Sequence, residues 1–254
     1  MLPALIEIIP PALPLSATVV LPGSKSLTNR ALILAALSSG TVTLHGALWS
    51  EDTQAMVHCL RTLGFDLAVS HDPDEPANRT IRVEGRGGEI PNGGTPDAPL
   101  ELFVENAGTA ARFLAAMVCL GRGTFRLSGI PRMHQRPQAA LFQALRQLGY
   151  AVETPNDFLP AVITGTGPRP SAVCSVSVGE SSQFASALIL GQRTGGWKIS
   201  VTGANEDELP YVEMTQRLVA EFPWHGSDYV IAPVGSGARY LLGAGCELPA
   251  AGSR

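Results

Sequence analysis

Three short polar stretches of the sequence each lead directly into an apolar run of helical composition. They carry hydroxyl, amide and basic side chains: Lys25, Ser26, Thr28 and Arg30 in PGSKSLTNR, Asn106, Gly108 and Thr109 in NAGTAAR, and Ser181, Ser182 and Gln183 in ESSQF. A helix N-terminus presents free N–H groups and about half a positive charge, which favours bound anions. If the three helix ends meet, these side chains predict a site for a multiply charged anion.

An ordinary N-cap is the alternative for each stretch taken alone, because Ser, Thr and Asn are preferred at that position. The three stretches together with Lys25, Arg30 and Arg136 favour the anion site. Arg136 lies in the run PRMHQRP, and its planar guanidinium suits a carboxylate or a phosphate. Arg132 and Arg112 are interpreted as structural. We expect Arg132 to pair with an acidic residue and Arg112 to need a partner on its apolar helix.

The segment GSKS shares a Lys-Ser pair with nucleotide-binding P-loops but lacks their glycines. Ser24 stands directly before Lys25, and Val19 or Val20 stands where an earlier glycine is required. We therefore exclude a nucleoside triphosphatase.

The elements that position these stretches repeat three times along the chain. In each copy an apolar helix is followed by a strand that ends in Gly and then by a second helix. The predicted first helices span 28–37, 109–120 and 182–190, the strands span 41–46, 124–129 and 198–203, and the second helices span 52–64, 137–149 and 210–222. Pro137 and Pro210 fall where a first-turn proline is tolerated.

The first helices are apolar nearly all round, which is typical of helices buried inside a domain. We therefore predict an α/β fold of three units with approximate threefold symmetry, in which buried parallel helices lie inside outer sheets. In that arrangement the N-termini of the three helices converge.

The composition restricts the classes of function. A chain of 254 residues with 45% hydrophobic side chains can bury a core, and a net charge of -4 without a basic run excludes a nucleic-acid partner. Residues 1–18 include Glu7 and several prolines and are too polar for a membrane helix, so we expect a cytoplasmic protein with no membrane partner.

His58 is interpreted as a packing residue and His134 as a solvated loop residue.

The cysteines of the chain stand far apart and form no CxxC pair, so no metal site and no cofactor is expected. They are interpreted as small buried hydrophobic residues, and they are Cys59, Cys119, Cys174 and Cys246.

At these residues the sequence resembles the 5-enolpyruvylshikimate-3-phosphate synthase family. The segments LPGSKSLTNRALILAAL, ENAGTAARFLAA, GIPRMHQRP, ESSQF and LPYVEMT occur in the order of the family and cover roughly residues 8–222. The resemblance implies transfer of the enolpyruvyl group of phosphoenolpyruvate to shikimate 3-phosphate, a step toward chorismate and the aromatic amino acids. It also implies two similar domains, each of three βαβαββ units, hinged about a cleft.

The resemblance also implies the role of each site residue. Shikimate 3-phosphate is expected at Lys25, Ser26, Arg30, Ser181, Ser182, Gln183 and Tyr211, and phosphoenolpyruvate at Lys25, Asn106, Gly108 and Arg136. Lys25 contacts both substrates in this scheme and is the predicted catalytic residue.

Two residues depart from the pattern of the family. Glu208 stands where the family usually has a phosphate-binding Ser, and it brings a carboxylate to an anion site. Phe113 stands where some members have Pro, which we expect to shift the second helix terminus and with it the phosphoenolpyruvate pocket.

The resemblance divides the chain into three parts. Residues 1–20, with a strand near 5–9, are expected to be a strand and hinge of the second domain, 21–225 the substrate-binding domain, and 226–254 a truncated start of the second domain. In that last part Ser236 and Tyr240 align with the family, but Val234 replaces the usual Asp. The family draws its acidic general base from the second domain, so we expect the chain to need a separate second-domain chain for activity.

Two alternatives remain open. The first is a catalytically inactive domain that binds anions weakly. The second is a relative of the enolpyruvyl transferase that acts on UDP-N-acetylglucosamine, but that family relies on a Cys in a mobile loop, and the corresponding run GIPRMHQRP has none.

Overall fold

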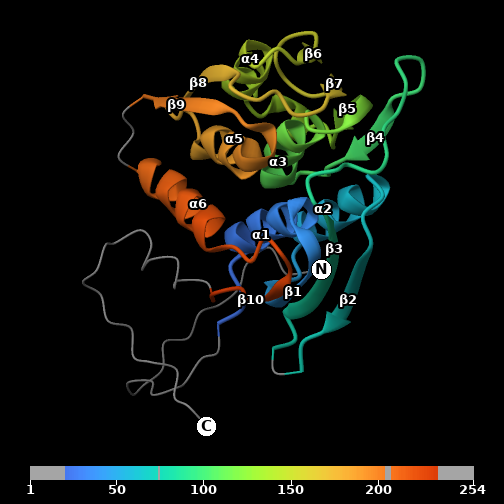
Figure 1. Cartoon of the computed structure of the whole chain (residues 1–254), viewed down its shortest axis with the longest axis vertical. Coiled ribbons are helices and arrows are strands. Elements are labelled where there is room, and N and C mark those ends of the chain that lie inside the picture. The colour runs from blue at the N-terminus through green and yellow to red at the C-terminus, as the bar shows by residue number, and fades with distance from the viewer. Residues whose placement is uncertain (1–20, 74, 204–206, 234–254) are drawn as a thin grey trace, which may run out of the picture.

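The structure is a computed structural model that describes residues 21–73, 75–203 and 207–233. Its helices within these ranges are α1 (Lys25–Leu37), α2 (Glu51–Thr62), α3 (Gly108–Val118), α4 (Ala139–Gln147), α5 (Ser182–Gly195) and α6 (Leu209–Glu221), with one 3₁₀ turn at Met133–Gln135. The strands are β1 (Ser39–Leu48), β2 (Leu67–His71), β3 (Asn78–Arg86), β4 (Leu100–Phe103), β5 (Arg122–Ser128), β6 (Ala151–Glu153), β7 (Ala161–Thr166), β8 (Val173–Ser177), β9 (Lys198–Thr202) and β10 (Ser227–Val230) (Figure 1).

The predicted elements of all three repeats are present. Each first helix, the strand after it and each second helix overlap the ranges expected from the sequence. Pro210 lies in the first turn of α6, as predicted. The prediction for Pro137 is wrong, because α4 begins at Ala139 with Gln138 at its N-cap, which leaves the proline in the preceding loop.

The sheets repeat one pattern. The first has the strand order β10-β1-β3-β2 and the second the order β4-β5-β7-β6, and in each a parallel edge pair is followed by antiparallel strands. The third sheet consists of the parallel pair β8-β9, and the described residues add no antiparallel strands to it. β10 pairs with β1 from Val42 and Ser227 to His45 and Val230, so the end of the described chain completes the first sheet.

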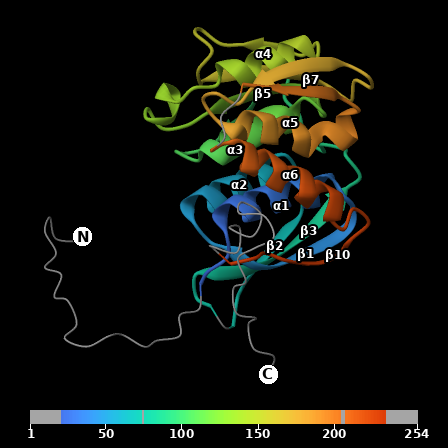
Figure 2. The ribbon, with the colours of Figure 1, turned by 90° about the vertical axis from the view of Figure 1, so that its left-hand side faces the viewer.

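The central helices α1, α3 and α5 lie between the first and second sheets (Figure 2). Every residue of α1 from Leu27 to Leu37 and every residue of α3 is buried, as expected for helices that are apolar on all sides. Small side chains such as Ala31, Ala35 and Ala115 allow close packing of these helices. This arrangement confirms the predicted α/β fold with buried helices and outer sheets.

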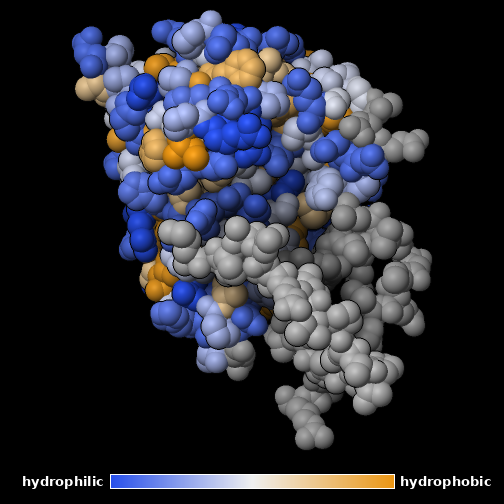
Figure 3. Space-filling model, turned by 180° about the vertical axis from the view of Figure 1, so that it is seen from behind, coloured by the Kyte–Doolittle hydropathy of each residue, from blue (hydrophilic) through white to orange (hydrophobic). Residues whose placement is uncertain are grey.

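The surface of the described residues that is visible from behind is mostly polar, and the hydrophobic patches on it are small (Figure 3). None of the helices in the described ranges is both long and apolar enough to cross a membrane.

The predicted division into 1–20, 21–225 and 226–254 stays a prediction. The expected strand at 5–9 and the aligned Ser236 and Tyr240, like Val234, lie outside the described residues. The boundary at residue 225 falls just before β10, which belongs to the first sheet.

Candidate functional site

The N-terminal halves of α1, α3 and α5 meet, and three side-chain hydrogen bonds join them. Asn29 Nδ2 donates to Thr109 Oγ1 at 2.8 Å, and Arg30 Nη2 donates to Ser186 Oγ at 3.0 Å. The third runs from Arg112 Nη1 on α3 to Gln183 Oε1 on α5 at 3.2 Å. These bonds confirm the predicted convergence.

A pocket of about 280 Å³ opens at the ends of α1, α5 and α6. It is lined by Ser26, Arg30, Ser181, Ser182, Gln183, Glu208 and Tyr211. Six of these residues are predicted ligand contacts, and Glu208 is the predicted departure from the family pattern. The structure therefore brings together the residues expected at shikimate 3-phosphate, with the exception of Lys25.

Arg30 is the buried cation of this pocket. Its side chain donates from Nε to Thr215 Oγ1 at 2.8 Å, from Nη1 to the Ser26 carbonyl at 3.0 Å and to the Ser26 hydroxyl, and from Nη2 to Ser186 Oγ. All of these acceptors are neutral, and Arg30 forms no ion pair with a carboxylate of the described ranges. Burial lowers the pKa of Arg30 to about 10, so the guanidinium remains charged near neutral pH. A buried cation without a counter-ion favours a bound anion.

The aromatic ring of Phe113 packs against the guanidinium of Arg30. Its ring is 1% exposed, and the guanidinium carbon of Arg30 lies 5.1 Å from the ring centroid. The expected shift of the helix terminus at Phe113 stays a prediction.

Arg112 and Arg136 form a second cationic centre beside Gly108. Arg136 Nη1 donates to the Asn106 carbonyl at 2.8 Å, and Arg112 Nη2 donates to the Pro137 carbonyl at 2.8 Å. Both guanidiniums lie so close to Gly108 that a Cβ at this position would collide with them. The N-cap residue of α3, Ala107, offers no side-chain acceptor to the first amides of the helix.

Arg112 belongs to this centre, and our sequence reasoning missed it as a site residue. It is 3% exposed, its Nε has no hydrogen-bond partner, and burial together with the charge of Arg136 lowers its pKa to about 10. An arginine on an otherwise apolar helix, four residues after Gly108, was the signal that could have identified it. The expectation for Arg132 is wrong, because its described partner is the neutral amide of Gln135 at 3.3 Å.

Lys25 lies outside the pocket lining. Its Nζ forms an ion pair with Asp52 Oδ2 on α2 at 3.1 Å, and its side chain is 49% exposed. The catalytic role expected for Lys25 stays a prediction, since a ligand would have to compete with Asp52 for the ammonium group.

Glu208 lines the pocket and accepts a hydrogen bond from the backbone of Ser182. Ser181 also acts as an ordinary N-cap, because its Oγ accepts from the Gln183 N–H at 3.2 Å. Two backbone amides at the N-terminus of α5 therefore already donate to acceptors of the protein itself, Glu208 and Ser181.

His58, His134 and the cysteines of the described ranges do not line the anion pocket. The interpretation of His58 as a packing residue is wrong, because this residue is exposed on α2. His134 Nε2 accepts from the Gly129 N–H at 3.2 Å and so shapes the loop before Arg136. Cys59, Cys119 and Cys174 are buried, and burial raises the pKa of Cys59 to about 12 and that of Cys174 to about 11. Within the described ranges no three His, Cys, Asp or Glu residues are grouped to hold a metal ion. Cys246 lies outside those ranges.

Comparison with known proteins gives consistent matches. A family model described as EPSP synthase (3-phosphoshikimate 1-carboxyvinyltransferase) matches residues 9–225. The 3-phosphoshikimate 1-carboxyvinyltransferase of Opitutus terrae is 43% identical over 224 residues, and that of Rhizobium etli is 37% identical over 260 residues. These alignments cover 87% and 95% of this chain but only 50% and 59% of the relatives.

A solved structure shares the fold. The EPSP synthase of Acinetobacter baumannii superimposes with a TM-score of 0.66 at 19% sequence identity, over 87% of this chain and 51% of that chain. The chain thus spans about half the length of the proteins that it matches.

Proposed function

This chain belongs to the EPSP synthase family, and we propose that it binds shikimate 3-phosphate as the substrate-binding half of an enolpyruvyl transferase. The observation that carries the proposal is the buried guanidinium of Arg30, which lines a pocket at the ends of α1, α5 and α6 and donates only to neutral partners. The ligand anion supplies the missing negative charge.

In this proposal the phosphate of shikimate 3-phosphate lies at the N-terminus of α5. There its oxygens accept hydrogen bonds from backbone and side-chain donors of Ser181, Ser182 and Gln183. Arg30 and Ser26 bind the ring substituents of the same molecule. Tyr211 is 37% exposed at the mouth of the pocket, where its hydroxyl can reach the ligand.

Phosphoenolpyruvate binds at the second cationic centre. Arg136 and Arg112 supply two guanidiniums for its carboxylate and phosphate, and the uncapped amides of α3 at Gly108 add backbone donors. Asn106 fixes Arg136 through its carbonyl oxygen. Gln183, which contacts Arg112 and also lines the first pocket, places the two substrates next to each other.

Turnover requires groups beyond these two pockets. Enolpyruvyl transfer needs a proton acceptor beside the attacking hydroxyl and a proton donor at the vinyl carbon. Lys25 is proposed to leave Asp52 and contact both substrates. We further propose that a second domain on another chain closes the cleft and supplies the acidic base, and that the assembly works in the cytoplasm without a cofactor.

A second candidate function is an anion-binding domain without turnover. The hydrogen bond from Ser182 to the Glu208 carboxylate favours it, because this carboxylate occupies a donor that the substrate phosphate would use.

A calorimetric titration separates the binding proposal from an unspecific anion site. Shikimate 3-phosphate should bind more tightly than either shikimate or inorganic phosphate, since only the complete ligand reaches both the α5 terminus and Arg30. Equal affinity for inorganic phosphate and shikimate 3-phosphate would leave only the anion-binding function.

A further inference from the structure

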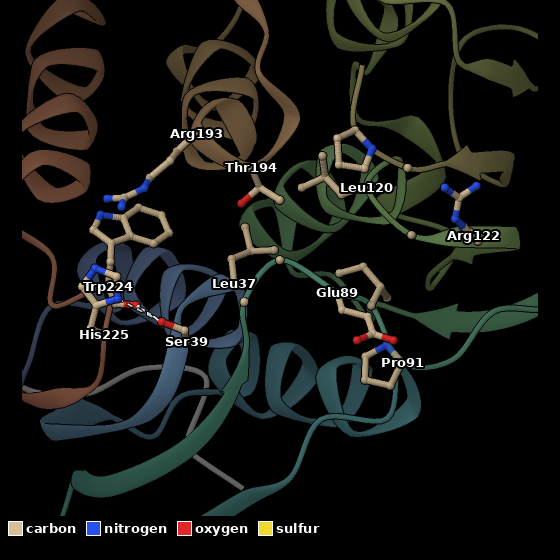
Figure 4. Close-up of a pocket in the computed structure, with 16 residues that line it drawn as sticks. Leu37, Ser39, Glu89, Pro91, Leu120, Arg122, Arg193, Thr194, Trp224 and His225 are labelled. Atoms are coloured by element: carbon tan, nitrogen blue, oxygen red, sulfur yellow. Dashed lines mark hydrogen bonds between the residues drawn. The ribbon is translucent and has the colours of Figure 1, made fainter. Parts of the chain in front are cut away.

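The arginines at the two ends of the central helices are held in different ways. A hollow of about 770 Å³ at the end opposite the anion pocket includes Leu37, Leu120 and Arg193 in its lining (Figure 4). There the guanidinium carbon of Arg193 lies 4.6 Å from the ring centroid of Trp224, and its side chain donates no hydrogen bond to the described residues. Arg30 at the anion pocket is instead held by hydroxyl groups of two other helices.

Two buried hydroxyl groups accept hydrogen bonds from the guanidinium of Arg30. Ser186 lies on α5 and Thr215 on α6, and both are 0% exposed. Arg30 Nε donates to Thr215 Oγ1 at 2.8 Å, and Arg30 Nη2 donates to Ser186 Oγ at 3.0 Å. The two hydroxyl oxygens lie 2.9 Å apart and are hydrogen-bonded to each other. Helices α1, α5 and α6 therefore meet at one guanidinium.

The donors and acceptors of this group have one consistent arrangement. Thr215 Oγ1 lies 2.8 Å from the Tyr211 carbonyl one turn earlier on α6, and a carbonyl only accepts, so the Thr215 proton lies there. Thr215 is then left with lone pairs for its other two partners. Ser186 must therefore donate to Thr215 and accept from Arg30. Both hydroxyl protons are used within the protein, and the pair serves Arg30 as acceptors only.

This arrangement fixes the guanidinium without neutralising its charge. Hydroxyl oxygens carry no net charge, whereas a carboxylate in place of Thr215 would offset the attraction of Arg30 for an anion. Nη2 carries two N–H bonds, and Ser186 is its one acceptor in the described part of the chain, so the second N–H is available to a ligand. A donor that is already fixed loses less conformational freedom when the ligand binds.

We propose that Thr215 is a positioning residue of the shikimate 3-phosphate site, which holds the Arg30 guanidinium in the orientation that the ligand requires. Thr215 does not line the anion pocket, so it acts through Arg30 rather than by contact with the ligand. Because Thr215 also accepts from Ser186, it joins α5 to α6 beside the guanidinium. This role rests on the function proposed above.

The Nε–H of Arg30 tests the role without a ligand. Its hydrogen exchange, followed by NMR in the isotope-labelled full chain, should be slow because the bond is buried and has an acceptor; the signal is assigned by its loss in Arg30→Met. Thr215→Val keeps the branched shape but lacks the hydroxyl, and it should speed the exchange about tenfold. Thr215→Ser restores the hydroxyl and should return the exchange toward the parent rate. The Nε–H of Arg193 is the unprotected reference.

Calorimetry with shikimate 3-phosphate tests the consequence for binding. Thr215→Val should lower the affinity about fivefold, the usual size of coupling between residues in contact, and Thr215→Ser should restore most of it. In an Arg30→Met background, Thr215→Val should have no further effect, because the hydroxyl acts through the guanidinium. A fivefold loss in that background would refute this route. Thr215→Ala gives the same comparison if valine disturbs the packing.

Thr62→Val is the matched control. The Thr62 hydroxyl also donates to the carbonyl one turn earlier, that of His58 at 3.1 Å, but it lies on α2 outside the anion pocket. This variant should change neither the exchange of Arg30 nor the affinity.

The outcomes separate the positioning role from the function on which it rests. Parent-like exchange and affinity in Thr215→Val, with a parent chain that binds shikimate 3-phosphate, would refute the positioning role alone. A parent chain that binds shikimate 3-phosphate no better than inorganic phosphate would refute the proposed function. The exchange comparison would then still show whether Thr215 orients Arg30.

Discussion

The carboxylate of Glu208 accepts a hydrogen bond from the backbone N–H of Ser182, with 2.6 Å between Oε2 and the nitrogen. The amide belongs to the first turn of α5, whose free N–H groups form the natural anion site of this helix. The protein thus places its own anion where the proposed phosphate binds. Shikimate 3-phosphate must displace this carboxylate or bind beside it, and either route weakens binding.

Replacing Glu208 with Ser should therefore tighten the binding of shikimate 3-phosphate. Removing one negative charge a few ångströms from the phosphate is worth on the order of 1 kcal/mol near a protein surface, which is about a fivefold gain in affinity. Salt screens the repulsion, so the gain should be larger at low ionic strength. Calorimetry at two salt concentrations measures both effects.

Glu208→Gln is the matched control for that experiment. It removes the charge but keeps an oxygen that can accept from the Ser182 amide. If the charge is decisive, the Gln variant should approach the Ser variant in affinity. If both variants bind no better than the parent chain at low salt, Glu208 does not oppose the ligand.

Arg30→Met should weaken the binding of shikimate 3-phosphate by tenfold or more. A charge-assisted hydrogen bond contributes roughly 1.5–3 kcal/mol, and Arg30 is the fully buried cation of the pocket. Met keeps an apolar stem over Phe113 and so limits the cavity that a smaller residue would leave. Titration of the Met variant beside Arg217→Met, which changes an exposed arginine on α6, measures the loss; equal affinities would exclude Arg30 from the ligand site.

Gly108→Ala should reduce the affinity for phosphoenolpyruvate and leave the affinity for shikimate 3-phosphate nearly unchanged. The added Cβ collides with the ends of the Arg112 and Arg136 side chains, so both guanidiniums must move away from the α3 terminus. Because flexible side-chain ends absorb the change, the free energy of unfolding should shift by less than about 1 kcal/mol. Fluorescence or calorimetric titration with each substrate distinguishes this result from general damage, which would lower both affinities.

The ion pair between Lys25 and Asp52 should contribute little to stability, because exposed pairs are typically worth roughly 0–1 kcal/mol. We expect Asp52→Asn to change the free energy of unfolding by no more than that amount. Lys25→Ala should in contrast weaken shikimate 3-phosphate binding about tenfold, as for any lost charge-assisted contact. Chemical denaturation of both variants measures the contribution of the ion pair to stability, and calorimetric titration measures ligand affinity. Unchanged affinity in Lys25→Ala would show that Lys25 does not contact shikimate 3-phosphate.

The repeats could be read from the sequence because each follows a regular period. Helices that are apolar on all sides, such as α1 and α3, are expected to be buried. The polar residues directly before each helix predict that the site lies at the helix N-termini. The position of β10 beside β1 could not be predicted, since a parallel pairing between Val42 and Ser227 leaves no local signal. Arg112 did leave a signal, as an arginine on an otherwise apolar helix, but its proximity to Arg136 and Gly108 became visible only in the structure.

The chain on its own should form the enolpyruvyl product only slowly. General base catalysis needs a proton acceptor within hydrogen-bond reach of the attacking hydroxyl, and the one carboxylate that lines the anion pocket, Glu208, is already engaged by the Ser182 amide. An open pocket also admits water, which reduces the electrostatic contribution to the rate. Phosphate release from the two substrates together measures turnover, and adding a separately produced second domain of an EPSP synthase should raise it. Rapid release by the chain alone, abolished in Lys25→Ala and retained in Glu208→Gln, would show that the chain supplies a base other than Glu208.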